Sequence, residues 1–166
     1  MITAQQIIDR FGMKPLLEEG GYYVETYRCD ETICTDALDD RYGSERNIST
    51  AILYLLTDDT CSKMHRVKSD EIFHFYSGDP VLMLNIFPDG SDKLITLGSD
   101  ISAGQLPQII VPHGTWQGAM IIEPGRFALM GCTVAPGFEF EDFQIADRDR
   151  LLGEYPERNR ILQKLL

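Results

Sequence analysis

Short segments rich in aromatic and β-branched residues recur between turn sequences over most of this chain, and this spacing limits the fold more than any other feature. The turns combine glycine or proline with polar residues, and they lie at 77–80, 88–90, 112–114 and 124–125. Many short strands joined by close turns predict an all-β sandwich or barrel. Strands are expected at about 22–28, 50–56, 63–68, 71–77, 80–87, 93–98, 107–112, 117–122, 126–133 and 138–145.

Helical patterns are confined to the two ends of the chain. Thr3 and Gln6 form a capping box, so a short amphipathic helix is expected over 3–11. The polar, acidic stretch 29–47 predicts a long loop or a hairpin excursion. Two further helices are expected to pack on the outside of the barrel, at 147–153 and 156–165.

Length and charge narrow the class of protein. A chain of 166 residues predicts a single domain spanning 1–166. The formal net charge of −11 would repel phosphate backbones, so no nucleic-acid partner is expected. The sequence has no long apolar run and no signal peptide, which predicts a cytoplasmic protein without a membrane partner. The cysteines lack the close spacing of zinc or redox motifs, so reduced thiols are expected, and Cys132 is interpreted as inert packing.

Two of the three histidines lie in the stretch 65–78. This stretch resembles the first motif of the cupins, a family of jelly-roll proteins. His65 matches the first histidine of that motif, Glu71 matches its glutamate, and Gly78 matches its glycine. Val67 stands where the motif has its second histidine. The resemblance implies an all-β, double-stranded β-helix (the cupin jelly roll), with the short N-terminal helix and the C-terminal helices added to it.

The stretch 112–117 resembles the second cupin motif. Pro112 and Gly114 match its proline and glycine, but Gln117 replaces its histidine. Two of the four usual metal-ligand positions are therefore altered, and a neutral amide is a weak ligand for a transition metal. The sequence thus predicts no confident cofactor and disfavours a divalent metal.

A metal site remains open in one arrangement. If His74 entered the cavity beside His65 and Glu71, the three side chains would form a two-histidine, one-carboxylate set. Strict alternation along the strand places His74 on the face opposite Glu71, and a β-bulge would overturn that assignment.

The resemblance is closer to one branch of the cupins. The segments 19–28, 49–56, 65–80, 104–119 and 131–143 are similar to those of the cupin family 5 proteins, which share the jelly roll of the dTDP-sugar 3,5-epimerases. The resemblance covers nearly the whole chain. It implies a homodimer and a ligand-sized cavity, and it implies no particular reaction. A Pro-His-Pro-Glu-Gly-Gly turn is usual in that family, and this chain has a different sequence at 15–21.

The candidate site combines acid–base groups with aromatic and amide groups. A histidine or a buried glutamate can exchange protons near neutral pH, and a tyrosine can return a proton. Each also has a structural interpretation, as a bonded core residue or an ordinary barrel wall. The catalytic candidates are His65, Glu71, Tyr27 and Tyr76, and the ligand-binding candidates are Tyr23, Glu25, Arg28, Arg66, His74, Trp116 and Gln117.

Two groups of these candidates are chosen for their side-chain chemistry. Tyr23, Glu25 and Tyr27 alternate along one strand face, which suits either stacking on a sugar or an ordinary wall. Arg28 or Arg66 could hold the anionic part of a substrate, or could be surface arginines without that role.

Three functions follow from these candidates. The first is a metal-independent isomerase or epimerase of a sugar or sugar nucleotide, with His65 as the base. The second is a non-catalytic module that binds a small polar or carbohydrate-like ligand. The third is a metal-dependent cupin oxygenase or isomerase, which the altered positions Val67 and Gln117 disfavour.

Overall fold

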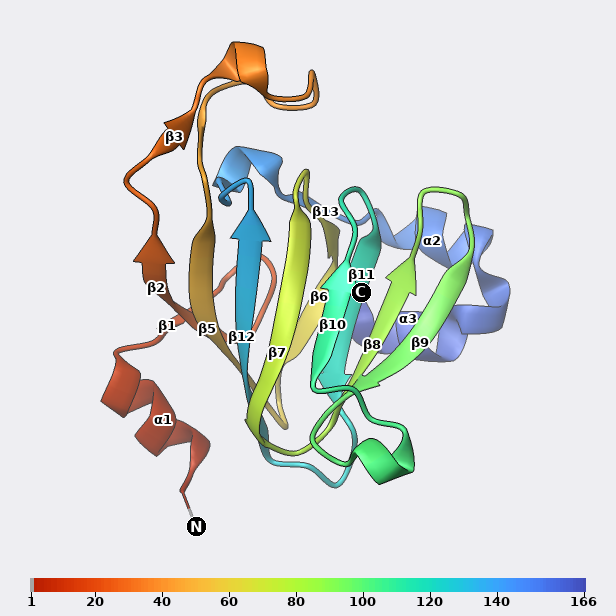
Figure 1. Ribbon diagram of the computed structural model, residues 1–166. Helices are drawn as coiled ribbons and strands as arrows, with labels where there is room; N and C mark the ends of the chain where they lie inside the picture. Colours follow the sequence, from red (N-terminus) through yellow and green to blue (C-terminus); the bar gives the residue numbers. More distant parts are fainter. Residues whose placement is uncertain (1) are drawn as a thin grey trace.

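The computed structural model describes residues 2–166 and places them in two facing antiparallel β-sheets with helices on the outside (Figure 1). The six-stranded sheet has the order β1-β2-β5-β12-β7-β10, and the five-stranded sheet has the order β13-β6-β11-β8-β9. The strands of the first sheet are β1 (Lys14–Pro15), β2 (Tyr22–Arg28), β5 (Thr50–Thr57), β12 (Phe127–Ala135), β7 (Asp70–Gly78) and β10 (Gln108–Val111). Those of the second are β13 (Gln144–Ile145), β6 (Cys61–Arg66), β11 (Trp116–Ile121), β8 (Val81–Ile86) and β9 (Asp92–Leu97).

The main core lies between the two sheets, because alternate residues of their strands point inward. Phe73 on β7 and Met130 on β12 meet Met83 on β8 and Ile121 on β11 in one buried cluster. The period-2 alternation of a half-buried strand produces this arrangement, with every second side chain facing the partner sheet. The polar side chains that share this interior are therefore few, and they define the candidate site.

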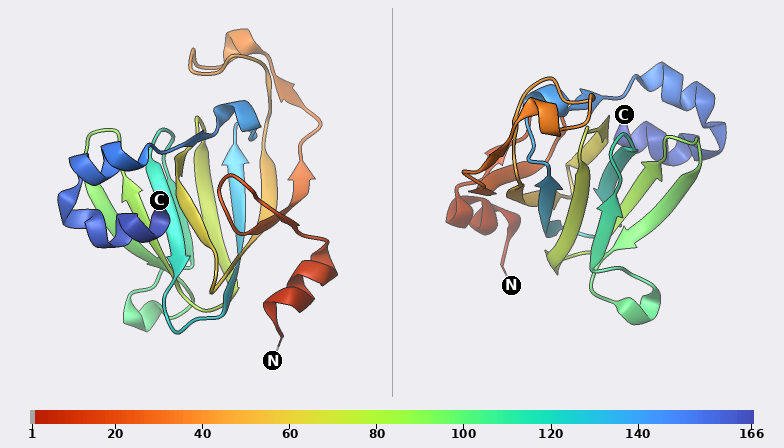
Figure 2. Two further views of the ribbon diagram at one scale, coloured as in Figure 1. Left: turned by 180° about the vertical axis from the view of Figure 1, so that it is seen from behind. Right: turned by 45° about the horizontal axis from the view of Figure 1, so that its top comes forward.

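Helices cover the outer faces of both sheets (Figure 2). Helix α1 (Ala4–Phe11) begins at the Thr3–Gln6 capping box and buries Ile7 against the six-stranded sheet. Helices α2 (Arg148–Glu154) and α3 (Asn159–Leu165) pack Leu162 and their other apolar residues against Met64 and neighbouring residues of the five-stranded sheet. No helix within residues 2–166 has the length and apolar character needed to cross a membrane.

The acidic stretch expected as a loop or hairpin is a hairpin excursion closed by the two-stranded pairing of β3 (Thr32–Ile33) with β4 (Arg46–Asn47). Its base is tied to the body of the protein by Arg46, a residue that is 1% exposed and whose guanidinium donates two hydrogen bonds to Asp142, at 2.8 and 2.7 Å. A buried ion pair with this bidentate geometry fixes orientation as well as supplying energy.

The predicted all-β jelly roll with small helices is confirmed, and the boundaries of most strands fall within two residues of those expected. The strand expected at 138–145 is wrong. That segment forms a 3-10 helix at Phe140–Asp142 and only then the two-residue strand β13. The reason is tertiary, because the turn brings the Asp142 carboxylate inward to Arg46. The last expected helix likewise starts with a 3-10 turn at Pro156–Arg158 before α3.

Candidate functional site

A cavity of about 310 Å³ opens at one end of the space between the sheets. The turn before β2 and the segment that follows β12 form its rim, while β2, β5, β7 and β12 supply its wall. Its lining residues are Leu16, Glu18, Glu19, Tyr23, Glu25, Arg28, Thr50, Ile52, Glu71, Cys132, Val134, Phe138, Glu139, Phe140 and Phe143. The volume lies at the lower end of the range for small-molecule sites.

Glu71 is the buried acid of this cavity, with only 6% of its surface exposed. Strand β7 directs its side chain inward with Phe73, as alternation requires. Across the interior, the Gln117 side-chain amide on β11 donates a hydrogen bond to one Glu71 oxygen. The Cys132 thiol on the neighbouring strand β12 donates to the other oxygen at 3.4 Å. The Glu71–Gln117 bond therefore joins the two sheets at the site.

Burial raises the pKa of Glu71 above its ordinary value of 4.5. The nearby His65 ring and the hydrogen bonds from Cys132 and Gln117 act in the opposite direction, while the charge of Glu19 raises the pKa further. The pKa of a carboxyl group in this setting is shifted toward neutral pH, and such a group can give and take a proton. Burial also raises the pKa of the Cys132 thiol well above its usual range, so this sulfur remains a thiol rather than a nucleophilic thiolate.

Glu19 enters the cavity from a glycine turn. Gly20 has φ +109°, and a Cβ at this position would lie 2.1 Å from the Cys61 carbonyl oxygen, so only glycine allows the turn to approach β6 this closely. One Glu19 oxygen accepts a hydrogen bond from the Ser62 hydroxyl at 2.7 Å. The other lies 3.8 Å from His65 Nε2. The turn thus delivers a second carboxylate to the wall that holds Glu71.

His65 is buried beside the cavity rather than in its lining. Its ring stacks on Phe143, with centroids 5.1 Å apart, and its Nε2 faces Glu19. Its Nδ1 lies 2.7 Å from the Lys63 carbonyl oxygen, which can only accept, so Nδ1 carries a proton. In the neutral ring Nε2 is then an acceptor. The inward position agrees with the cupin motif, but Glu19 and Phe143 stand between His65 and a ligand.

A β-bulge in β2 decides which of its residues face the cavity. The pairing with β5 shifts between Glu25 and Tyr27, so Arg28 rather than Tyr27 follows Tyr23 and Glu25 into the wall. Tyr27 is 52% exposed and lies outside the lining, which corrects the expectation of a continuous Tyr23, Glu25 and Tyr27 face.

The Arg28 guanidinium is already occupied by acidic partners. It donates to both Glu25 oxygens at 3.0 and 2.9 Å and to Glu139 at 2.6 Å, and further bonds reach Asn47 and the Phe138 carbonyl. The hydrogen bonds that Arg28 donates to Glu25, and next those to Glu139, raise the pKa of Arg28. The group therefore braces the rim, and its charge is balanced within the chain.

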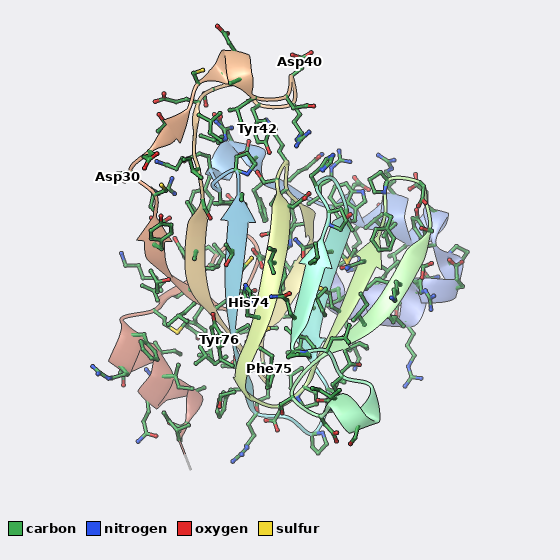
Figure 3. The ribbon with its side chains drawn as sticks, viewed as in Figure 1. Asp30, Asp40, Tyr42, His74, Phe75 and Tyr76 are labelled. Atoms are coloured by element: carbon green, nitrogen blue, oxygen red, sulfur yellow. The ribbon has the colours of Figure 1, made fainter. Side chains whose placement is uncertain are left out.

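His74 and Tyr76 lie on the outer face of the six-stranded sheet, where Figure 3 labels both on β7. The His74 ring contacts Gln108 and Thr133 on the flanking strands, at 3.2 and 3.3 Å, and stacks with Tyr76. The bulge opposite β12 lies beyond His74, between the partners of Phe75 and Ser77, so it does not change the face of His74. Neither side chain lines the cavity with Glu71, contrary to their selection as site residues.

Arg66 and Trp116 are also outside the cavity. Trp116 packs against the cluster beneath the C-terminal helices, because its neighbour Gln117 takes the inward position on β11. The Arg66 guanidinium stacks on the Trp116 ring, 4.5 Å from its centroid, and donates to Gln144. The sequence-based expectation that these two residues bind a ligand here has no support from their placement.

The donor set does not fit a cupin metal. Within residues 2–166 no three histidine, cysteine, aspartate or glutamate side chains are grouped closely enough to hold a metal ion. His74, the candidate third ligand, lies on the opposite sheet face, and apolar Val67 is buried at the place of the second motif histidine. Transition-metal sites need three or four well-placed protein donors, which Glu71 and His65 with an amide do not supply.

Sequence reasoning missed several residues of the wall. Glu19 was marked only by its place in the Glu-Gly-Gly turn that the resemblance quoted, and Cys132 was interpreted as packing although it lies against Glu71. Behind the cavity lining, Asn85 on β8 was also missed: it is fully buried opposite Gln117, and neither polar atom of its side-chain amide has a hydrogen-bond partner. No sequence signal singles out Asn85, because it follows an ordinary apolar strand.

Two facing antiparallel sheets around a closed-in cavity, with motif residues on β6, β7 and β11, define the cupin class of jelly-roll proteins. The chain belongs to the family described as Cupin superfamily (DUF985), whose model matches residues 5–146. It is 32% identical over 133 residues to the uncharacterised protein YML079W of Saccharomyces cerevisiae. That match covers 75% of this chain and 66% of the yeast protein, so the chain spans just under two thirds of that relative.

Solved structures give the same family picture. Protein SO0799 from Shewanella oneidensis matches with a TM-score of 0.85 and 33% identity, covering 99% of this chain and 98% of that one. A hypothetical protein from Leishmania major matches with a TM-score of 0.88 and 27% identity over the same shares. Oxalate decarboxylase from Bacillus subtilis matches at 0.54 with 13% identity, covering 94% of this chain and 38% of that one, which shows a shared fold alone.

Proposed function

We propose that this cupin binds a small organic molecule in the cavity and exchanges a proton with it through Glu71, as a metal-independent isomerase or epimerase does. The observation that supports this proposal is a carboxyl group, only 6% exposed, in the wall of a 310 Å³ cavity, with a pKa that burial raises. Glu19 supplies a second carboxylate on the same wall. Two carboxyl groups in unlike environments are a recurrent arrangement for an acid and a base.

The roles differ from those that the motif alone suggests. Glu71 faces the ligand and acts as the proton-transferring group. His65 acts as a positioning residue, because its Nε2 faces Glu19 at 3.8 Å and its ring is fixed by Lys63 and Phe143. A proton lost from carbon next to a carbonyl group passes to a carboxylate oxygen, and the same group can return it.

Deuterium exchange tests this proposal. D-glucose, D-fructose and D-glucosamine are incubated with the protein in D₂O, and incorporation at the carbon next to the carbonyl is followed by NMR. We expect incorporation with the unaltered protein and a loss of about 100-fold or more in Glu71→Gln, the usual size of a general acid–base contribution. The exposed variant Glu45→Gln is the matched control and should retain the rate. Equal rates in Glu71→Gln and the unaltered protein would contradict the role.

Non-catalytic binding is the second candidate. It is favoured by one observation, that both oxygens of Glu71 already accept bonds from the chain, one from Gln117 and one from Cys132. A glutamate held in this way can serve as a polar anchor. Saturable binding of a probe, with the probe recovered undeuterated from D₂O, would support this candidate over the isomerase.

A further inference from the structure

The charged side chains of the cavity wall are mostly negative. Of its lining residues five are glutamates and one is an arginine, namely Glu18, Glu19, Glu25, Glu71, Glu139 and Arg28. The single cation is not available to a ligand, since Arg28 already bonds Glu25 and Glu139. Phosphate and carboxylate ligands need unpaired cations or clustered N–H donors, and the wall supplies neither among its side chains. The cavity therefore disfavours a sugar nucleotide or any other strongly anionic compound.

The cavity wall is rich in acceptors. Glu71 lies at its buried end, where Gln117 behind the lining donates to one of its oxygens. Glu18 and Glu19 add further carboxylate oxygens to the same wall. Carboxylate oxygens accept several hydrogen bonds, and a ligand group with several N–H donors satisfies more of them than a single hydroxyl does.

Aromatic rings complete the wall around these acids. Phe138 and Phe140 pack edge to face with centroids 5.2 Å apart, and Tyr23 and Phe143 also line the cavity. The corner at Pro136 and Gly137 directs Phe138 inward, and the Gly137 N–H donates to the Asn47 carbonyl oxygen at 2.8 Å. Aromatic faces attract cations, and the attraction grows when water is excluded.

We infer that the cavity selects an organic ammonium compound, a small amine or quaternary ammonium that carries hydroxyl groups, over neutral and anionic analogues. The glutamate-rich wall supplies a negative potential, the aromatic rings contact the cation, and the wall carboxylates accept hydrogen bonds from a primary ammonium group. The inference rests on the proposed function in one respect, that this cavity holds the ligand. It adds the charge class of the substrate.

Matched probes test the charge preference. Choline is compared with 3,3-dimethyl-1-butanol, which has the same shape without the charge, and D-glucosamine is compared with D-glucose and D-glucose 6-phosphate. Binding is measured by isothermal titration calorimetry. We expect each ammonium compound to bind about 10-fold or more tightly than its neutral partner, in keeping with desolvated cation–π and charge contacts. The phosphate should bind most weakly.

Paired variants separate the cavity from the acidic surface, since a net charge of −11 attracts any cation weakly. Glu19→Gln removes one charge from the wall and keeps an acceptor for Ser62, and Glu45→Gln removes one charge from the exposed surface. We expect the ammonium preference to fall about fivefold or more in Glu19→Gln and to change less than about twofold in Glu45→Gln.

The outcomes distinguish the inference from the proposed function. Tighter binding of glucose or glucose 6-phosphate than of glucosamine overturns the charge class and leaves a small-molecule site in place. Equal effects of the two variants also overturn it, because the attraction would then belong to the whole surface. The absence of binding by every probe overturns the inference too, whereas the proposed proton transfer is judged separately by deuterium exchange.

Discussion

At the scale of single residues, the site depends on where polar groups are buried. Glu71 was predictable, because the cupin motif and strand alternation both direct it inward. Glu19 and Asn85 were not, since a glutamate in a glycine turn and an asparagine in an apolar strand have no distinctive spacing. Both depend on tertiary neighbours. Glu19 contacts the Ser62 and His65 side chains, and the Asn85 amide is buried where no hydrogen-bond partner reaches it.

The raised pKa of Glu71 makes a prediction for stability. Ionising this group costs more in the folded protein than in the unfolded chain, so its stabilising contribution is present below about pH 4.5 and is lost as pH rises through the folded pKa. Glu71→Gln does not show this loss of stability, because glutamine does not ionise. We expect the free energy of unfolding of Glu71→Gln, relative to the unaltered protein, to increase steadily from acidic to mildly alkaline pH.

Urea denaturation at a series of pH values measures this difference. Glu45→Gln, whose side chain is exposed, should show a nearly constant difference over the same series. A constant difference for Glu71→Gln as well would mean that Glu71 ionises in the folded protein as easily as in the unfolded chain.

At the scale of elements, the sequence predicted which segments form strands but not where their pairing slips. The bulge in β2 replaces Tyr27 by Arg28 in the wall, and a second register shift between β6 and β11 accompanies the inward His65. A bulge depends on the neighbouring strand, so periodicity along one strand cannot locate it. The expected alternation consequently held up to Glu25 and failed beyond it. Alternation holds at Trp116. Because Gln117 points into the interior, its neighbour Trp116 points to the outer face of the five-stranded sheet, although both were expected to bind a ligand.

The glycine turn before β2 makes a prediction at this scale. Gly20→Ala places a Cβ 2.1 Å from the Cys61 carbonyl oxygen at a φ of +109°, so the turn must move away from β6. We expect a loss of about 2 kcal/mol or more in the free energy of unfolding, from backbone strain together with the clash.

Gly104→Ala is the matched control for this change. Gly104 also has a positive φ, +80°, but a Cβ there meets no atom within 4 Å. Its cost should be limited to the backbone strain of about 1 kcal/mol. Equal losses in the two variants, measured by urea denaturation, would show that the close approach to Cys61 is unimportant.

At the scale of the whole molecule, the net charge of −11 bears on how two copies of the chain can meet. Helix α1 covers one side of the outer face of the six-stranded sheet, and the other side carries Ile72, His74 and Tyr76 on β7, Thr133 on β12 and Ile110 on β10. These five residues, here called the outer patch, include no carboxylate, and Ile110 is 60% exposed. Two copies of a chain with a net charge of −11 repel each other least through such a surface.

We propose that the outer patch joins two copies of this chain in a homodimer. Ile110 pairs with Ile72 across β10 and β7, so the two isoleucines form a continuous apolar strip at the centre of the patch. Ile110→Asp would place two carboxylates in the interface, and burying unpaired charges there is strongly unfavourable. We expect sedimentation velocity to show a dimer for the unaltered protein and a monomer for Ile110→Asp. Ile145→Asp, on the exposed strand β13 of the other sheet, adds the same charge and should remain dimeric. A monomeric unaltered protein, or a dimer that survives Ile110→Asp, would contradict this arrangement.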